Sequence, residues 1–373
     1  MLASLLFLLA AGWVCYVLFG YPLLLMALTR KTPAPTAKRF EPKTVTVLLA
    51  VHNGERWIRN KLESLLALDY PRELLRILVV SDGSTDQTVA ITQEFGGRGV
   101  DCIAVRKGGK AMALNAGLER AKGEIILFTD VRQPLERQSL RELVAGFADP
   151  RVGVVSGELI IREGDSLAED NVGLYWKYEK WIRIQLSRLD SVLGATGCIY
   201  AMRRELTRPL PPGCLLDDMF LPLCAFFQGY RVLLDTHARA YDEPVTLESE
   251  FRRKVRTLAG VYQVIGYFPE LLGPRNRMWI HFVSHKFGRL LAPFALMIMA
   301  VTAFGLAAPW SYWMAAGQAL FYGLAAVDLV IPESSPVKRF TSPIRTFVVL
   351  MAASLVAASI LVKPAGAFWK PAR

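Results

Sequence analysis

The first residues of the chain form a long apolar run, and this run constrains the architecture more than any other feature. Leu2 to Leu28 contains no charged side chain, and a helix of that length crosses a hydrocarbon core of about 30 Å. A cleavable signal peptide would carry positive charge before a shorter apolar run. Here the positive charges follow the run, at Arg30, Lys31, Lys38 and Arg39. We therefore expect a membrane helix whose following residues face the cytosol.

Three further apolar runs lie near the other end of the chain: Leu290–Ala308, Met314–Ile331 and Thr346–Val362. Alternation across the membrane then predicts about four transmembrane helices, with both termini outside. Asp328 is the charged residue of the second run, and we expect it to have a structural role rather than to line an ion pathway. Residues 262–289 mix aromatic and basic side chains, which is typical of interfacial helices on the inner leaflet.

The charge and the cysteines limit the partners and the compartment. A net charge of +11 fits nucleic acid, anionic membrane lipids or a phosphorylated substrate. The sequence has no RNA-binding signature or zinc-finger spacing, so we expect no nucleic acid partner. Five cysteines without a C-x-x-C pair argue against a disulfide framework and fit a reducing compartment.

Between the first apolar run and the last three, short β-rich stretches alternate with helical ones. The expected strands are Val45–Val51, Ile77–Ser81, Cys102–Val105 and Ile125–Thr129. The expected helices are Arg56–Ala67, Asp86–Phe95, Lys110–Arg120 and Leu135–Phe147. This alternation predicts an α/β, Rossmann-like domain with a doubly wound sheet, which binds ligands beyond the carboxyl ends of its strands.

Two motifs near those strand ends are suited to a nucleotide. Asp82 ends a strand before a glycine turn; it either faces a base or ribose or serves only as a turn residue. Lys107-Gly108-Gly109-Lys110 begins a helix, where charge, exposed N–H groups and the helix dipole can hold a diphosphate. The alternative for this second motif is a solvated basic turn.

Three acidic or basic motifs are candidates for chemistry. Asp130 follows an apolar strand and either binds a hard cation, Mg²⁺ or Mn²⁺, or caps a helix. Asp217 and Asp218 interrupt an apolar run, which is costly unless one carboxylate is used, for example as a general base. The cations between Arg252 and Arg256 either anchor the inner leaflet or clamp a phosphorylated leaving group.

In this order and spacing, the motifs resemble the processive branch of the family 2 glycosyltransferases, which includes cellulose, chitin and hyaluronan synthases. The resemblance extends over about Thr44 to Gln263. It implies a GT-A fold and an inverting transfer from a nucleotide sugar, expected to be UDP-linked, to a lipid-linked or growing glycan.

The resemblance also implies roles for single residues. Asp218 is the expected catalytic base, and Asp130 the expected metal ligand, as the first aspartate of the D-x-D motif. The expected substrate-binding residues are Glu55 in the nucleotide pocket, Asp82 for the nucleoside, Lys110 for the donor, Gly197 for the acceptor, and Arg253 and Arg256 for the leaving group, together with Asp130 and Asp217. Trp176 and Trp181 either stack on sugar rings or pack in the protein.

Two positions depart from the family pattern. Arg132 stands where the D-x-D motif has its second aspartate, and Thr257 stands where the Q-x-x-R-W motif has its tryptophan, so that only Arg256 of the latter remains. We therefore expect a limited transfer or short product, with a processive synthase that also exports its polymer as the alternative. Two further hypotheses are an inactive homologue that binds nucleotide sugar and a transporter subunit with a nucleotide-binding domain.

The expected organisation is a transmembrane helix over 1–30, a linker over 31–42 and a GT-A domain over 43–261. Interfacial helices over 262–289 and three transmembrane helices over 290–373 follow. The expected location is a bacterial-type inner membrane, with the catalytic domain in the cytosol and an oligomer or export partner as a further possibility.

Overall fold

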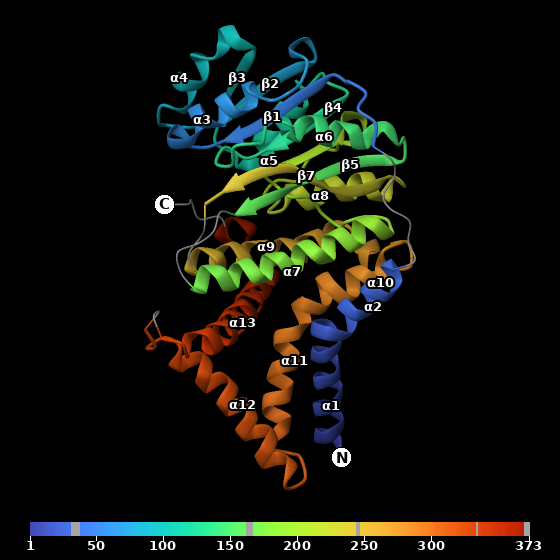
Figure 1. Ribbon diagram of the computed structural model, residues 1–373, viewed down its shortest axis with the longest axis vertical. Coiled ribbons are helices and arrows are strands. Elements are labelled where there is room, and N and C mark those ends of the chain that lie inside the picture. Colours follow the sequence, from blue (N-terminus) through green and yellow to red (C-terminus); the bar gives the residue numbers. More distant parts are fainter. Residues whose placement is uncertain (31–37, 162–166, 244–246, 333–334, 369–373) are drawn as a thin grey trace. The chain divides into compact units, whose positions relative to one another are not determined.

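The chain folds into two compact units (Figure 1). The computed structural model describes residues 1–30, 38–161, 167–243, 247–332 and 335–368, without the side chains of 167–175 and 247. The expected linker over 31–42 lies mostly outside these ranges. The helical unit comprises Met1–Lys31, Glu163–Gln185 and Pro244–Arg373, and the sheet unit comprises Thr32–Arg162 and Leu186–Glu243.

Within the described ranges, the sheet unit contains seven strands in the order β3-β2-β1-β4-β6-β5-β7. The four strands expected from the sequence are β1 (Val45–Val51), β2 (Leu75–Asp82), β3 (Val100–Val105) and β4 (Ile125–Thr129). They pair in parallel. The other strands are β5 (Val152–Ile161), β6 (Ile199–Arg203) and β7 (Arg231–Asp242). β6 is antiparallel to both of its neighbours, so the sheet is mixed. The predicted α/β fold is confirmed.

The helices of this unit cover a sheet whose strands are apolar on both faces. They are α3 (Glu55–Leu66), α4 (Thr88–Gln93), α5 (Lys110–Leu118), α6 (Ser139–Ala145) and α8 (Asp217–Phe227). Short 3₁₀ turns lie at Arg72–Leu74, Gly96–Arg98, Gly146–Ala148 and Arg204–Leu206. Ile58 and Leu62 of α3 are fully buried, and burying each such side chain contributes about 1.5–3 kcal/mol.

Close packing at Gly117 holds α5 against β1 and β2. A Cβ atom at Gly117 would lie 2.2 Å from Leu48 on β1 and 3.0 Å from Val80 on β2, so only glycine lets the helix approach the sheet this closely. Since α5 then starts beside the carboxyl end of β2, Lys110 is placed at the edge of the sheet where ligands bind in such folds.

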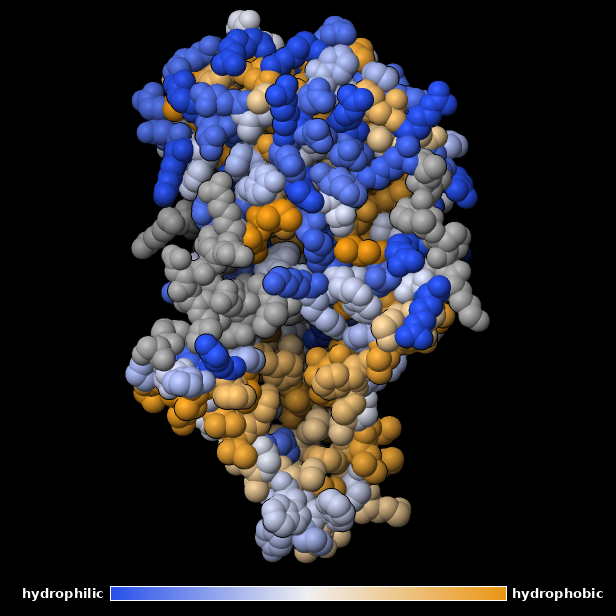
Figure 2. All heavy atoms as spheres, in the orientation of Figure 1, coloured by the Kyte–Doolittle hydropathy of each residue, from blue (hydrophilic) through white to orange (hydrophobic). Residues whose placement is uncertain are grey.

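The described part of the helical unit contains three helices long and apolar enough to cross a membrane: Leu2–Thr29, Trp279–Ala303 and Lys338–Leu361. The first consists of α1 (Leu2–Cys15), a π-helical turn (Tyr16–Gly20) and α2 (Tyr21–Thr29). The second consists of α10 (Trp279–His281), a π-helical turn (Phe282–Phe287) and α11 (Gly288–Ala303); the third consists of α13 (Lys338–Ala357) and a 3₁₀ turn (Ala358–Leu361). Figure 2 shows hydrophobic side chains gathered on the surface of these helices, as expected where lipid replaces water.

Among the described residues, three helices meet the length and hydropathy of a span, close to the expected count of about four. α12 (Trp310–Val327) covers most of the run Met314–Ile331, but it is not among the described helices that are long and apolar enough for a span. It begins with Trp310, Tyr312 and Trp313 and carries Gln318, and these polar-tipped side chains lower its hydropathy. The second candidate span begins at Trp279, inside the stretch that we expected to be interfacial.

The remaining helices of this unit are α7 (Leu167–Leu189) and α9 (Leu247–Tyr267), with 3₁₀ turns at Pro269–Leu272 and Ala365–Phe368. α13, the turn that ends it and the turn Ala365–Phe368 all contact α9, while Gly305 after α11 lies beside Ala3 of α1. The C-terminal end is therefore on the side of α9, and Gly305 is on the side of the N-terminus. The expectation that both termini lie outside stays a prediction, and three crossings are the alternative that this arrangement favours.

We predict that a phosphatase fused after Ala308 is active, whereas one fused after Phe368 is inactive. The reason is that we expect the basic residues after α2 to face the cytosol, and three crossings would bring the chain back to the same side. Phosphatase activity in cells expressing each fusion measures the side, with green fluorescent protein fusions as the complementary control. An active C-terminal fusion would contradict three crossings.

Candidate active site

The loops after β1 and β2 are tied together by reciprocal hydrogen bonds. The backbone N–H of Glu55 donates to Asp86 (3.0 Å), and the Glu55 carboxylate accepts from the N–H of Gln87 (3.0 Å). The N–H of Asn53, a residue with φ of 50°, donates to the Ser84 hydroxyl (3.1 Å). Glu55, expected in the nucleotide pocket, therefore lies at the carboxyl ends of β1 and β2. Its carboxylate holds the loop after β2.

Asp82 holds the next loop in the same way. One carboxylate oxygen accepts from the N–H of Gly108 (2.7 Å) and the other from the N–H of Gly109 (2.9 Å). Asp82 is 5% exposed, and Gly109 has φ of 86°, a backbone conformation that favours glycine. The carboxylate thus positions the loop before α5. A carboxylate has about four acceptor sites, so the predicted contact with a nucleoside is compatible with these bonds and stays a prediction.

Lys110 is the centre of a charged cluster formed by three elements. Its Nζ atom lies 2.9 Å from Oδ1 of Asp130, which follows β4, and 3.1 Å from Oδ1 of Asp217, the first residue of α8. Burial alone would lower the pKa of Lys110, but Asp130, Asp217 and Asp218 outweigh it and raise that pKa. Four residues predicted separately from the sequence are therefore neighbours, with the lysine fully cationic among them.

The loop Gly194–Gly197 packs against Asp218. A Cβ atom at Gly197 would lie 2.7 Å from Oδ2 of Asp218, so any larger residue would displace it. The N–H of Ala195 donates to the backbone carbonyl of Asp218 (2.6 Å), and Gly194 has φ of 134°. The expected acceptor loop and the expected base are thus in direct contact.

Lys61, which the sequence motifs did not include, positions the residues that flank Asp130. This fully buried lysine donates to the Thr129 hydroxyl (2.6 Å) and to the carbonyl of Gln133 (2.5 Å), so it fixes the chain on both sides of Asp130. Burial lowers the pKa of Lys61 to about 7. A signal was present: Lys61 lies on the same helix face as Ile58, Leu62 and Leu65, where a lysine is unexpected.

Comparison with known proteins agrees with these motifs. Residues 46–210 match the model of the family described as "Glycosyl transferase family 2". This stretch is therefore similar to a family 2 glycosyltransferase domain. The solved mannosyltransferase PcManGT from Pyrobaculum calidifontis has the same fold, with a TM-score of 0.70 and 22% identity over 94% of this chain and 99% of that one. The predicted GT-A fold is therefore confirmed.

Curated relatives match parts of the chain. The probable glycosyltransferase YdaM of Bacillus subtilis is 26% identical over 64% of this chain and 60% of its own length. The poly-beta-1,6-N-acetyl-D-glucosamine synthase of Staphylococcus aureus is 30% identical over 60% of this chain and 56% of its own length. The chain thus spans less than two thirds of these relatives. They support family 2, while the finer relation to cellulose, chitin and hyaluronan synthases stays a prediction.

Arg132, which departs from the D-x-D pattern, forms an ion pair elsewhere in the sheet unit. The Arg132 guanidinium lies 2.5 Å from Oδ2 of Asp242 at the end of β7, and the Gln133 amide donates to the same oxygen (2.8 Å). Asp242 is buried, and a buried carboxylate needs such a partner. Arg132 is therefore engaged away from Asp130, and the sequence pattern contained no sign of this pair.

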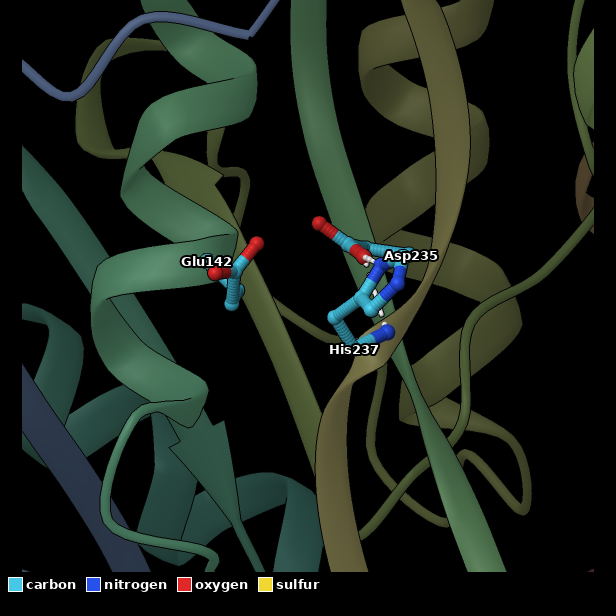
Figure 3. Close-up of side chains that lie close together, drawn as sticks. All are labelled: Glu142, Asp235 and His237. Atoms are coloured by element: carbon cyan, nitrogen blue, oxygen red, sulfur yellow. Dashed lines mark hydrogen bonds and ion pairs between the residues drawn. The ribbon is translucent and has the colours of Figure 1, made fainter.

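A second acidic group lies between α6 and β7 (Figure 3). Glu142, Asp235 and His237 offer ligand atoms within 4.8 Å of one another. The Lys38 ammonium forms ion pairs with Asp235 and with Glu142 (3.3 Å), so a positive charge already offsets both carboxylates. This group is separate from Asp130, the expected metal ligand. We assign no metal to the group.

The cations expected to clamp the leaving group belong to the helical unit, on α9. Arg253 donates to the buried Glu250 (2.9 Å) and lies 4.5 Å from the centre of the Trp176 ring. Lys254 lies 5.3 Å from the same ring, and burial lowers its pKa to about 8. Trp176 therefore packs against cations, and the roles of Arg253 and Arg256 in catalysis stay predictions.

Proposed function

We propose that the chain is an inverting glycosyltransferase that moves a sugar from a UDP-linked donor to a glycan or lipid-linked acceptor at the cytosolic face of a membrane. The observation that carries this proposal is the cluster of Lys110, Asp130, Asp217 and Asp218 at one edge of a family 2 domain. The apolar helices support the membrane location, and the relatives named as N-acetylglucosamine polymer synthases support a glycan product.

In the proposed reaction, Asp218 accepts the proton of an acceptor hydroxyl as its oxygen attacks the anomeric carbon. The bond from that carbon to the diphosphate breaks in the same step, so an α-linked donor gives a β-linked product. The nucleoside diphosphate leaves with the bonding electrons, and Lys110 with the first N–H groups of α5 stabilises its charge. Gly197 packs against Oδ2 of Asp218, and we place the acceptor hydroxyl within hydrogen-bonding distance of this carboxylate.

The residues of the cluster fit a divalent cation. Asp130 and Asp217 present carboxylate oxygens around one ammonium group, and Mg²⁺ prefers one or two carboxylates together with phosphate oxygens. The solved mannosyltransferase structure contains GDP-Man and Mn²⁺. When bound, Mg²⁺ or Mn²⁺ would offset the charge of the departing diphosphate.

We predict that chelation abolishes transfer and that added Mn²⁺ or Mg²⁺ restores it, despite Arg132. Arg132 is held by Asp242, so its charge does not replace the metal at the diphosphate. The measurement is transfer from labelled nucleotide sugar with and without EDTA, and the control is readdition of the metal in excess. Full activity in the chelator would show that the metal is dispensable.

The experiment that tests the proposed function uses purified protein and a panel of labelled nucleotide sugars. Release of nucleoside diphosphate from one donor, and transfer of its sugar to added glycan or lipid acceptors, supports the proposal. An inactive homologue binds nucleotide sugar without consuming it, whereas a transporter subunit consumes none and changes flux across vesicles instead.

We predict a short product rather than a long polymer made and exported by this chain alone. Thr257 stands in place of the tryptophan of the Q-x-x-R-W motif and offers no ring face on which an acceptor sugar could stack. Its hydroxyl donates to the Arg253 carbonyl (2.9 Å). Three candidate spans also supply few helices for a channel. The measurement is product size and sidedness in reconstituted vesicles. The relatives named as polymer synthases keep export as the alternative, and a high-molecular-weight glycan in the lumen, without a partner protein, would establish it.

A further inference from the structure

The Lys110 ammonium occupies the position that a metal ion would need. It bridges Oδ1 of Asp130 and Oδ1 of Asp217 at 2.9 and 3.1 Å. A divalent cation bound to Oδ1 of Asp130 through a bond of about 2.1 Å would lie within about 5 Å of this ammonium if the lysine stayed in place. At that distance a single and a double positive charge repel strongly in a partly buried site. Lys110 in this position and a metal at the same oxygen of Asp130 therefore disfavour each other.

We propose, on the basis of the proposed function, that Lys110 is a built-in competitor that occupies the cation position of Asp130 and Asp217 until metal and donor bind together. Lys110 then moves from the carboxylates to the diphosphate of the donor. In this arrangement the metal alone binds weakly, and the donor diphosphate provides new acceptors for the displaced ammonium. The lysine thus makes metal binding depend on the presence of the nucleotide sugar.

The surroundings of Lys110 allow its side chain to move while its backbone stays fixed. The loop before it is held by the bonds from Gly108 and Gly109 to Asp82. Its side chain has four rotatable bonds and ends beside the first turn of α5, where N–H groups attract phosphate. By contrast, the Arg132 guanidinium is held by Asp242, a buried acceptor that it shares with Gln133. Lys110 is therefore the cation that can change partners.

The test is binding of Mn²⁺ alone, measured by electron paramagnetic resonance or calorimetry on the full-length protein in detergent. Lys110→Met should bind Mn²⁺ at least about tenfold more tightly than the wild type, since the competing charge is removed. Lys110→Arg retains a cation and should stay close to the wild type. Lys122→Met removes the same charge from an exposed position beyond α5 and should change Mn²⁺ affinity less than twofold.

Two further measurements complete the design. Adding Asp130→Asn to Lys110→Met should remove the gain in Mn²⁺ affinity, and UDP with saturating Mn²⁺ should bind Lys110→Met at least about tenfold more weakly than the wild type. No gain in Lys110→Met, or a gain that survives Asp130→Asn, would overturn the competition. Sugar transfer by the wild type is measured separately, so a failure of the proposed function is distinguishable from a failure of this inference.

Discussion

Replacing Asp218 by asparagine is expected to lower the rate of sugar transfer by about 10²–10⁴-fold, because asparagine cannot accept the acceptor proton. The side chains are nearly equal in size, so the contact with Gly197 and the first turn of α8 should persist. Nucleotide affinity should therefore stay within about twofold of the wild type. Transfer rate and UDP affinity, measured on the same preparation, separate loss of chemistry from loss of binding.

Two further variants serve as controls for Asp218→Asn. Glu205→Gln removes the same charge from an exposed carboxylate of the sheet unit and should transfer sugar at the wild-type rate. Gly197→Ala keeps Asp218 but places a methyl group 2.7 Å from its Oδ2 atom, so it should lower turnover by displacing the carboxylate. Near-normal turnover of Asp218→Asn would remove this residue from the mechanism and favour another base.

The parts of the fold that the sequence predicted are those set by local pattern. β1 begins and ends at the expected residues, Val45 and Val51, because an apolar β-branched run is bounded by polar ones. Asp82, Lys110 and Asp130 were expected at one edge because parallel strands end together, and Lys110 and Asp130 are in contact. Periodicity and strand ends therefore locate the cluster without any tertiary information.

The parts that were missed depend on pairs distant in sequence. Arg132 and Asp242 are 110 residues apart, and neither residue alone indicates the other. The C-terminal turn Ala365–Phe368 contacts α9, and hydropathy alone does not indicate this contact. α12 does not meet the hydropathy of a candidate span, because Gln318 and the aromatic residues at its start lower it. Such features follow from packing, which a single sequence does not display.

The second large effect is expected at Asp328, which lies in a buried charge cluster of the helical unit. Asp328 has no exposed surface; it accepts from the Thr341 hydroxyl (2.6 Å) and from Arg345 (3.3 Å). Its carboxylate lies 3.4 Å from Nζ of Lys338, which also donates to the carbonyls of Asp328 (2.7 Å) and Ile331 (2.9 Å). The cluster joins the end of α12 to the start of α13.

Asp328→Leu should therefore destabilise the protein by about 3–5 kcal/mol, because it leaves the buried Lys338 without its carboxylate. The measurement is the apparent Tm of purified protein in detergent, which should fall by about 10 °C. Glu248→Leu breaks an exposed pair with Arg252 (3.2 Å) and should cost less than about 1 kcal/mol. Adding Lys338→Leu to Asp328→Leu should recover part of the loss, since the unpaired charge is removed with it. Equal effects of the buried and the exposed substitution would show that this cluster does not hold α12 and α13 together.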